Sequence, residues 1–88
     1  MGSSSKQTTE SAPDQIHVLI ADDHRMIAEA LRGTLLEHGG FLVNLSETLD
    51  GTLGVLRSNR KSKIVVLLDI TMPGMQGLHS VKQVIDAA

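Results

Sequence analysis

The chain of 88 residues contains no cysteine, no tryptophan, no tyrosine and a single phenylalanine. Without cysteine, neither a disulfide nor a thiolate metal site can form, and this absence is compatible with a reducing compartment. Without an aromatic platform, the chain has nothing on which the bases of single-stranded nucleic acid could stack. The hydrophobic core must therefore be built from aliphatic side chains.

Positive charge and long apolar stretches are also scarce. Eight basic side chains against ten acidic ones give a net charge of −2, so no overall positive field draws the chain to nucleic acid or to an anionic membrane. The longest apolar runs, HVLIA and IVVLL, are far shorter than the roughly 20 residues that a membrane-spanning helix needs. We expect no membrane partner, and contact with DNA only through a domain outside this chain.

The first fifteen residues, MGSSSKQTTESAPDQ, are polar and show no hydrophobic periodicity. Such a segment is typical of a disordered leader or of a cloning remnant, and we expect residues 1–15 to lie outside the folded domain. Residues 16–88 are the part that we expect to fold, as one domain. A domain of about 70 residues has a small margin of stability unless a metal or a partner adds to it.

Three strand-like segments recur along this domain. Residues 16–21 (IHVLIA), 41–45 (FLVNL) and 64–70 (IVVLLDI) are short, apolar and rich in β-branched side chains. Nearly continuous apolar runs of this length are typical of strands that are buried on both faces of a parallel sheet.

A helical pattern follows each of these strands. Ile27, Leu31 and Leu35 recur at intervals of four, and Gly39-Gly40 can end this helix in a left-handed conformation. Residues 46–48 supply capping oxygens for a second helix, and the loop TMPGMQG precedes a third. In the second helix Leu49, Leu53 and Leu56 are expected in the core, and the third carries Leu78, Val81, Val84 and Ile85 on one side.

This alternation predicts an α/β fold with right-handed βαβ crossovers and a parallel sheet covered on both faces. Asp22 and Asp23 follow the first strand directly, and Asp69 lies at the end of the third. The carboxyl ends of parallel strands form the ligand crevice, and adjacent strands lie roughly 5 Å apart. If these two strands are neighbours, three carboxylates meet in one pocket and repel unless they share a cation. Oxygen donors without cysteine or clustered histidine favour Mg²⁺ over zinc.

The segment IADDH, followed further along by LLDITMPGMQG, resembles the response-regulator receiver domain of two-component signalling. The resemblance covers residues 16–88 and is closest to the branch with a C-terminal helix-turn-helix DNA-binding domain. It implies a flavodoxin-like parallel sheet with strand order 2-1-3, of which this chain contains the N-terminal (βα)3 portion.

The resemblance also implies roles for individual residues. Asp69 would be the phosphoryl acceptor, and Asp22, Asp23 and Asp69 would bind Mg²⁺ together with the backbone carbonyl of Thr71. The phosphoryl donor would be a histidine kinase, and the product an aspartyl phosphate that works as a switch. Such a module is a cytoplasmic signalling component rather than a turnover enzyme, and it would control transcription through an output domain outside this chain.

The sequence departs from the family pattern at its C-terminal end. The pattern continues through two further strands and helices, with a Ser or Thr after the fourth strand and a Lys after the fifth, whereas this sequence stops at residues 85–88 (IDAA), before the fourth strand. The strand over 64–70 would then have an apolar, unpaired edge, which predicts self-association that completes the sheet. The alternative function is therefore a non-phosphorylated half-receiver that acts as an interaction or dimerisation module.

Two single residues, at positions 24 and 71, bear on further interpretations of the site. His24 follows the aspartate pair and could be a metal ligand or a general base, but its position favours a polar residue in the first turn of a helix. Phosphatases with an aspartyl nucleophile carry a second aspartate two residues after the first. Position 71 is Thr, so this class is set aside.

Overall fold

The computed structural model describes residues 15–88. The leader expected over residues 1–15 lies, apart from its last residue, outside this range and remains a prediction. Strands and helices alternate in the order β1 (Ile16–Ala21), α1 (Arg25–His38), β2 (Phe41–Ser46), α2 (Leu49–Ser58), β3 (Ile64–Leu68) and α3 (Leu78–Ala87). None of the helices in the described part of the chain has the length and apolar character needed to span a membrane.

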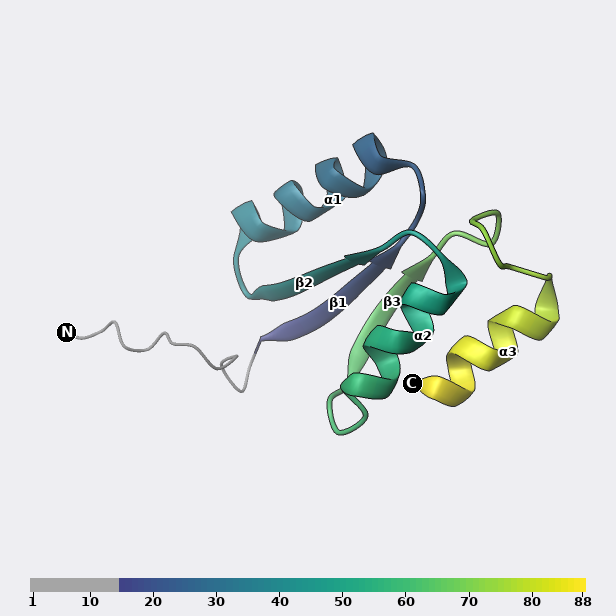
Figure 1. Cartoon of the computed structure of the whole chain (residues 1–88). Helices are drawn as coiled ribbons and strands as arrows, with labels where there is room; N and C mark the ends of the chain where they lie inside the picture. Colours follow the sequence, from purple (N-terminus) through teal and green to yellow (C-terminus); the bar gives the residue numbers. More distant parts are fainter. Residues whose placement is uncertain (1–14) are drawn as a thin grey trace.

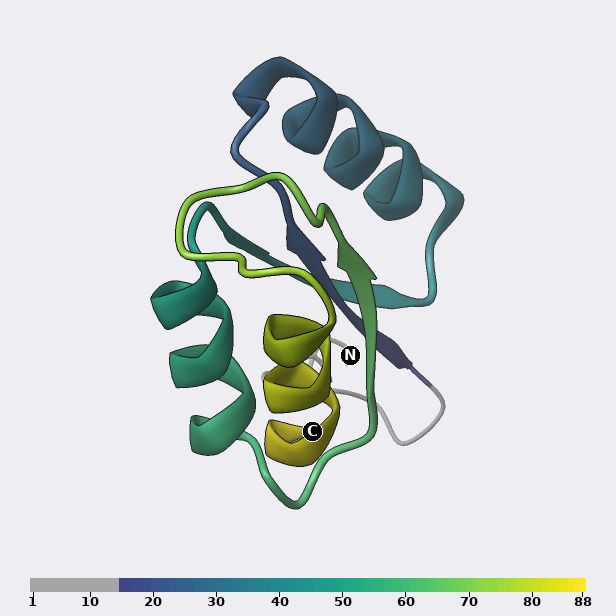
Figure 2. The ribbon, with the colours of Figure 1, turned by 90° about the vertical axis from the view of Figure 1, so that its right-hand side faces the viewer.

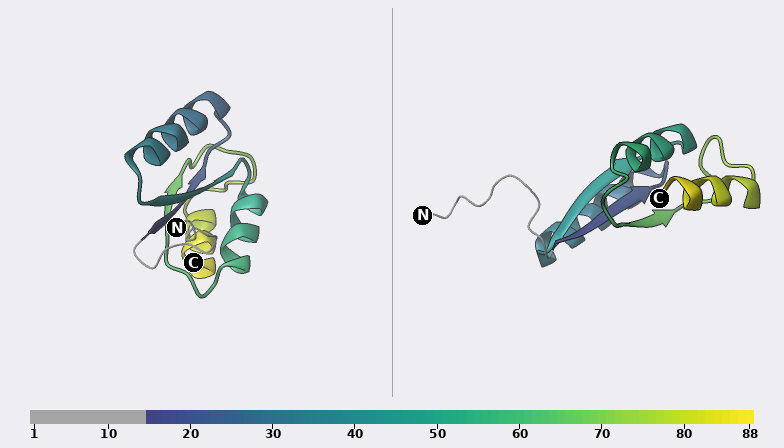
Figure 3. Two further views of the ribbon diagram at one scale, coloured as in Figure 1. Left: turned by 90° about the vertical axis from the view of Figure 1, so that its left-hand side faces the viewer. Right: turned by 90° about the horizontal axis from the view of Figure 1, so that it is seen from below.

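The three strands form one parallel sheet in the order β2-β1-β3 (Figure 1). Its central strand is β1, where Leu19 lies opposite Asn44 of β2 and Val66 of β3. Helix α1 covers one face of the sheet, and α2 and α3 lie together on the other (Figures 2 and 3). The α/β class, the strand order 2-1-3 and the (βα)3 arrangement of a flavodoxin-like fold are thereby confirmed.

Side chains of β1 alternate between the two faces, because successive residues of a strand point to opposite sides. Val18 and Ile20 are buried beneath α1, against Ala28 of that helix. Leu19 has no exposed surface and points to the other face. There it joins the aliphatic core formed by Leu49, Leu53, Leu56, Val84 and Ala87.

The apolar stripe of α1 is less buried than its periodicity predicts. Ile27 and Leu31 are 54% and 41% exposed, and Ala28 is the one buried residue of this helix. Among residues 15–88, α1 is the only helix on its face of the sheet, and it lies against β1 and β2. Part of its apolar stripe therefore extends past its packing partners.

The buried side of α3 also differs from its apolar stripe. Leu78 and Ile85 are 70% and 66% exposed, whereas Val84 of the same stripe is buried. The buried positions of this helix are Ser80, Val84 and Ala87, which are spaced at the helical period. The physical reason is that α3 packs beside α2, so contact with that helix decides which stripe is covered.

The loop between β3 and α3 is held against the start of α2. The backbone N–H of Leu49 donates a hydrogen bond to the carbonyl of Pro73 at 3.0 Å, and the side chain of Met72 is buried. Gly74 has a φ of 93°, and a Cβ added there would lie 3.0 Å from Cβ of Leu49. A side chain at position 74 would be strained both by the backbone conformation and by this close approach. The loop thus leaves β3 in a fixed direction.

Candidate functional site

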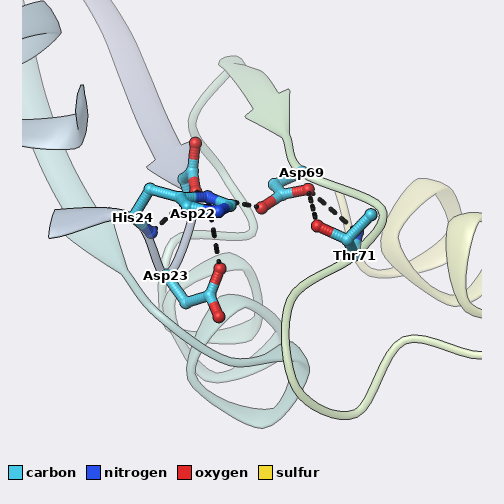
Figure 4. Close-up of polar contacts among 5 residues, drawn as sticks. All are labelled: Asp22, Asp23, His24, Asp69 and Thr71. Carbon is cyan, nitrogen blue, oxygen red and sulfur yellow. Dashed lines mark hydrogen bonds and ion pairs between the residues drawn. The ribbon is translucent and has the colours of Figure 1, made fainter.

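Asp22 and Asp69 lie next to each other at the carboxyl end of the sheet because β1 and β3 are paired in register. Ala21 lies opposite Leu68, and the backbone N–H of Asp69 donates to the carbonyl of Ala21 at 2.8 Å. The residue after each strand end therefore enters the same crevice. One ligand atom from each of Asp22, Asp23 and Asp69, together with one from His24, lies within 4.8 Å of all the others (Figure 4). The structure thus brings the three predicted carboxylates together, while their chemical roles stay predictions.

The Asp69 carboxylate stabilises a turn of the backbone at the end of β3. Its Oδ1 accepts hydrogen bonds from the backbone N–H of Thr71 at 2.9 Å and from the Thr71 hydroxyl at 2.7 Å. Aspartate commonly ends extended structure in this way, by binding the backbone two residues further on. Strand β3 consequently ends at Leu68, two residues before the end that the apolar run 64–70 predicts.

His24 is placed differently from the first-turn helix residue that the sequence favours. It is the N-cap of α1, with φ −86° and ψ 88°, and its backbone N–H donates to Oδ1 of Asp22 at 2.8 Å. Its Nδ1 lies 2.7 Å from the same oxygen, 3.5 Å from Oδ1 of Asp23 and 3.3 Å from Oδ2 of Asp69. The sequence interpretation therefore missed His24 as a member of the site. The feature of the sequence that could have indicated it is the position of His24 directly after the aspartate pair.

Hydrogen bonds and charges shift two pKa values in this cluster. The hydroxyl of Thr71, and after it the backbone N–H of the same residue, lower the pKa of Asp69 to about 2. The hydrogen bond with Asp22, followed by the negative charges of Asp22 and Asp23, raises the pKa of His24 above its usual value. Asp69 is therefore ionised throughout the physiological pH range, with its carboxylate available for binding or attack.

Replacing Thr71 with valine is expected to raise the pKa of Asp69 part of the way toward its ordinary value of about 3.9. The variant removes the hydroxyl donor and keeps the backbone donor and the side-chain shape. Because the pKa of Asp69 is lower in the folded than in the unfolded chain, its ionisation stabilises the fold above about pH 4, and this contribution is lost as the pH falls toward 2. Carboxyl ¹³C chemical shifts recorded across an acid titration give the pKa directly.

The matched control is Thr34→Val, whose hydroxyl donates to the carbonyl of Ala30 on α1. This control should leave the titration of Asp69 unchanged. An equal pKa of Asp69 in the wild type and in Thr71→Val would contradict the assignment of Thr71 as the principal cause.

The donor set of this crevice fits Mg²⁺. Oδ2 of Asp69 is buried and accepts no hydrogen bond from any residue of the described chain, although Nδ1 of His24 lies 3.3 Å from it. A buried carboxylate oxygen without a donor is costly, and a shared divalent cation would compensate that cost and the repulsion among the three carboxylates. Carboxylate oxygens are the ligands that Mg²⁺ prefers, and it keeps several waters when few protein ligands are present. The carbonyl of Thr71 remains a predicted further ligand.

An open depression of about 490 Å³ adjoins the acidic cluster. Asp22, His24 and Asp69 form its polar side, and its apolar side is formed by Ile20, Leu31, Leu67 and Leu68. The side chains of Asp22 and Asp69 are 18% and 15% exposed. A small anionic group can therefore approach the carboxylates from solvent without a rearrangement of the strands.

Comparison with protein families gives a match to the response regulator receiver domain over residues 18–87. These residues include all four members of the cluster, Asp22, Asp23, His24 and Asp69. The match thus covers the folded part of the chain almost completely. No solved structure matches the chain significantly.

Curated relatives are longer proteins in which this chain corresponds to a part. The transcriptional regulatory protein LiaR of Bacillus subtilis is 36% identical over 78% of this chain and 32% of its own length. The transcriptional regulatory protein YdfI of the same organism is 33% identical over 76% of this chain and 31% of its own. A protein-glutamate methylesterase/protein-glutamine glutaminase of Rhodopseudomonas palustris is 40% identical over 72% of this chain and 17% of its own. The chain thus spans about a third, or less, of the length of these relatives.

Proposed function

The chain belongs to the response regulator receiver domain family, and from that membership we propose that Asp69 accepts a phosphoryl group from a histidine kinase, with Mg²⁺ bound by Asp22, Asp23 and Asp69. The observation that carries this proposal is the convergence of the three carboxylates at one end of the sheet. An ionised aspartate beside a cation site has the two features that an acyl phosphate needs for its formation, a nucleophile and charge stabilisation.

The reaction is a transfer between two nucleophiles. A carboxylate oxygen of Asp69 attacks the phosphorus of a phosphohistidine, and the bond from phosphorus to the imidazole nitrogen breaks with its electron pair going to that nitrogen. Thr71 holds the carboxylate in place through its two hydrogen bonds. Mg²⁺ held by Asp22, Asp23 and Asp69 would supply positive charge to stabilise the phosphoryl oxygens. Asp69 is ionised at neutral pH, so no proton has to leave before attack.

The phosphorylated module works as a switch and not as a turnover enzyme, since the acceptor is a residue of the chain itself. The names of LiaR and YdfI describe transcriptional regulatory proteins, which supports a DNA-binding output through a domain outside residues 16–88. The chain matches only 17% of the methylesterase relative, so the esterase activity in that protein's name is not part of this proposal. A cytoplasmic location is part of the same proposal.

The test is incubation of the chain with Mg²⁺ and acetyl phosphate, followed by intact mass spectrometry. The expected product carries one phosphoryl group, and a chelator such as EDTA should prevent its formation. A protein mass that stays unchanged in the presence of Mg²⁺ would contradict the proposal.

A second candidate function, self-association without phosphorylation, is supported by the outer edge of β3. Within residues 15–88, β3 pairs with β1 on one side only, and Val65 and Leu67 of this strand are 51% and 42% exposed. A free strand edge with exposed apolar side chains can pair with the same edge of a second copy, whose backbone donors and acceptors are complementary to its own.

Val65→Lys is expected to disrupt such a dimer, because lysine on an edge strand opposes pairing of strands. Light scattering coupled to size exclusion, over a range of protein concentrations, measures the mass in solution. Leu78→Lys is the control, since Leu78 is an exposed residue of α3 and is not part of the sheet. A monomeric wild type at every concentration would rule out this candidate and leave the phosphoacceptor proposal intact.

A further inference from the structure

We infer that His24 is a fourth side-chain ligand of the divalent cation, so that the site binds nitrogen-preferring ions such as Ni²⁺ more tightly than its carboxylates alone would. The inference rests on the metal site proposed above and concerns the selectivity of that site. It starts from the direction of one side chain: the imidazole of His24 points into the space between the three carboxylates (Figure 4).

The distances around Nδ1 are those of neighbouring ligands on one metal ion. In an octahedral site with bonds of about 2.1 Å, adjacent donors lie about 3.0 Å apart. Nδ1 of His24 is 2.7, 3.5 and 3.3 Å from oxygens of Asp22, Asp23 and Asp69. These three separations bracket the value for adjacent ligands, so a cation among the carboxylate oxygens is also within reach of this nitrogen.

The backbone holds His24 where this reach is possible. Its N–H donates to Oδ1 of Asp22 at 2.8 Å, which fixes the chain between β1 and α1. The carbonyl of the same residue accepts the backbone N–H of Ala28 at 3.0 Å, so His24 is tied to the first turn of α1. The backbone of His24 is therefore held in place whether its imidazole bonds to Asp22 or to a cation.

The consequence for selectivity follows from the chemistry of the donor atoms. Mg²⁺ is a hard ion that takes oxygen ligands and gains little from an imidazole. Imidazole nitrogen suits Ni²⁺ and Zn²⁺, and affinity at mixed nitrogen and oxygen sites rises from Mn²⁺ toward Ni²⁺ and Cu²⁺. The side chain of His24 is 59% exposed, so coordination by its nitrogen leaves the solvent side of the ion open for water or phosphate.

The opposing interpretation is that the imidazole is only a hydrogen-bond partner of the carboxylates, which any cation must expel. The two interpretations predict opposite effects of His24→Ala. Loss of a ligand lowers the affinity for Ni²⁺, whereas loss of a competitor raises the affinity for every divalent ion. The alanine variant keeps the backbone hydrogen bond to Asp22, so the turn at the end of β1 is preserved.

Calorimetric titration of the whole chain with Mg²⁺ and with Ni²⁺ tests the inference. We expect His24→Ala to weaken Ni²⁺ binding by roughly tenfold or more and to leave Mg²⁺ binding within about twofold, because Mg²⁺ takes oxygen ligands. His79→Ala is the matched control, because His79 is an exposed histidine of α3, and it should change neither affinity. Electron spin echo spectroscopy with Mn²⁺ gives an independent readout, since a bound imidazole couples its ¹⁴N nucleus to the metal in the wild type and not in His24→Ala.

The outcomes separate the inference from the proposal on which it rests. If neither Mg²⁺ nor Ni²⁺ binds the wild type, the metal site itself is wrong. If both ions bind, and His24→Ala strengthens both or leaves their ratio unchanged without any ¹⁴N coupling in the wild type, the site stands and the assignment of His24 as a ligand is overturned.

Discussion

Asp69→Asn is expected to abolish phosphorylation of the chain by acetyl phosphate, with the mass of the protein unchanged after incubation with Mg²⁺. Asparagine has the same shape, and its carbonyl oxygen can still accept the hydrogen bond from the backbone of Thr71. It lacks the negative charge, however, and a neutral amide is a much poorer nucleophile than a carboxylate. The substitution thus removes the reacting group with little change in the geometry around it.

The control for this variant is Asp86→Asn, which neutralises an exposed aspartate of α3 outside the cluster. It should take up one phosphoryl group as the wild type does. Uptake of phosphate by Asp69→Asn to the same extent as by the wild type would show that another residue accepts the group. In that case the acidic cluster would serve only as a cation site.

Leu19→Ala is expected to lower the free energy of unfolding by about 3 kcal/mol, within the usual range for a buried leucine. Leu19 lies in the central strand, has no exposed surface and contacts the core of α2 and α3. Its loss leaves a cavity between the sheet and these helices that neighbouring strands, paired on both sides of β1, cannot easily fill. In a domain of this size the total stability is about 5 kcal/mol or slightly more, so the variant should lose most of its stability.

Urea unfolding followed by circular dichroism measures this effect. Leu42→Ala is the control, because Leu42 is the same residue type in β2 but is 40% exposed. Replacing Leu42 should lower the free energy of unfolding by less than about 1 kcal/mol, as is usual for surface positions. Equal losses in the two variants would contradict the burial of Leu19 in the core between the sheet, α2 and α3.

The order of strands and helices could be predicted from the sequence because hydrophobic periodicity is a local property. The apolar runs that begin at Ile16, Phe41 and Ile64 start their strands at those residues. Gly39 and Gly40, both with φ 87°, end α1 as expected. Thr48 caps α2 through its hydroxyl oxygen, which accepts the backbone N–H of Gly51.

Burial could be predicted less well, because the exposure of a side chain depends on which other elements lie against it. Ile27, Leu31, Leu78 and Ile85 have the spacing of core residues, yet each is exposed by more than two fifths. Periodicity identifies an apolar stripe on a helix, but it does not say whether a partner covers the stripe. For α3 the partner is α2, which no local pattern indicates.

The sequence by itself determined that Asp22, Asp23 and Asp69 stand at the ends of strands, because alternating apolar runs and helical patterns locate those ends. Only the tertiary structure decided that β1 and β3 are paired with Ala21 opposite Leu68, and that His24 turns its imidazole toward all three carboxylates. The reason is physical: the end of a strand is set by neighbours along the chain. A cluster of charges is set by pairing between distant segments and by the direction of a side chain in the turn that follows.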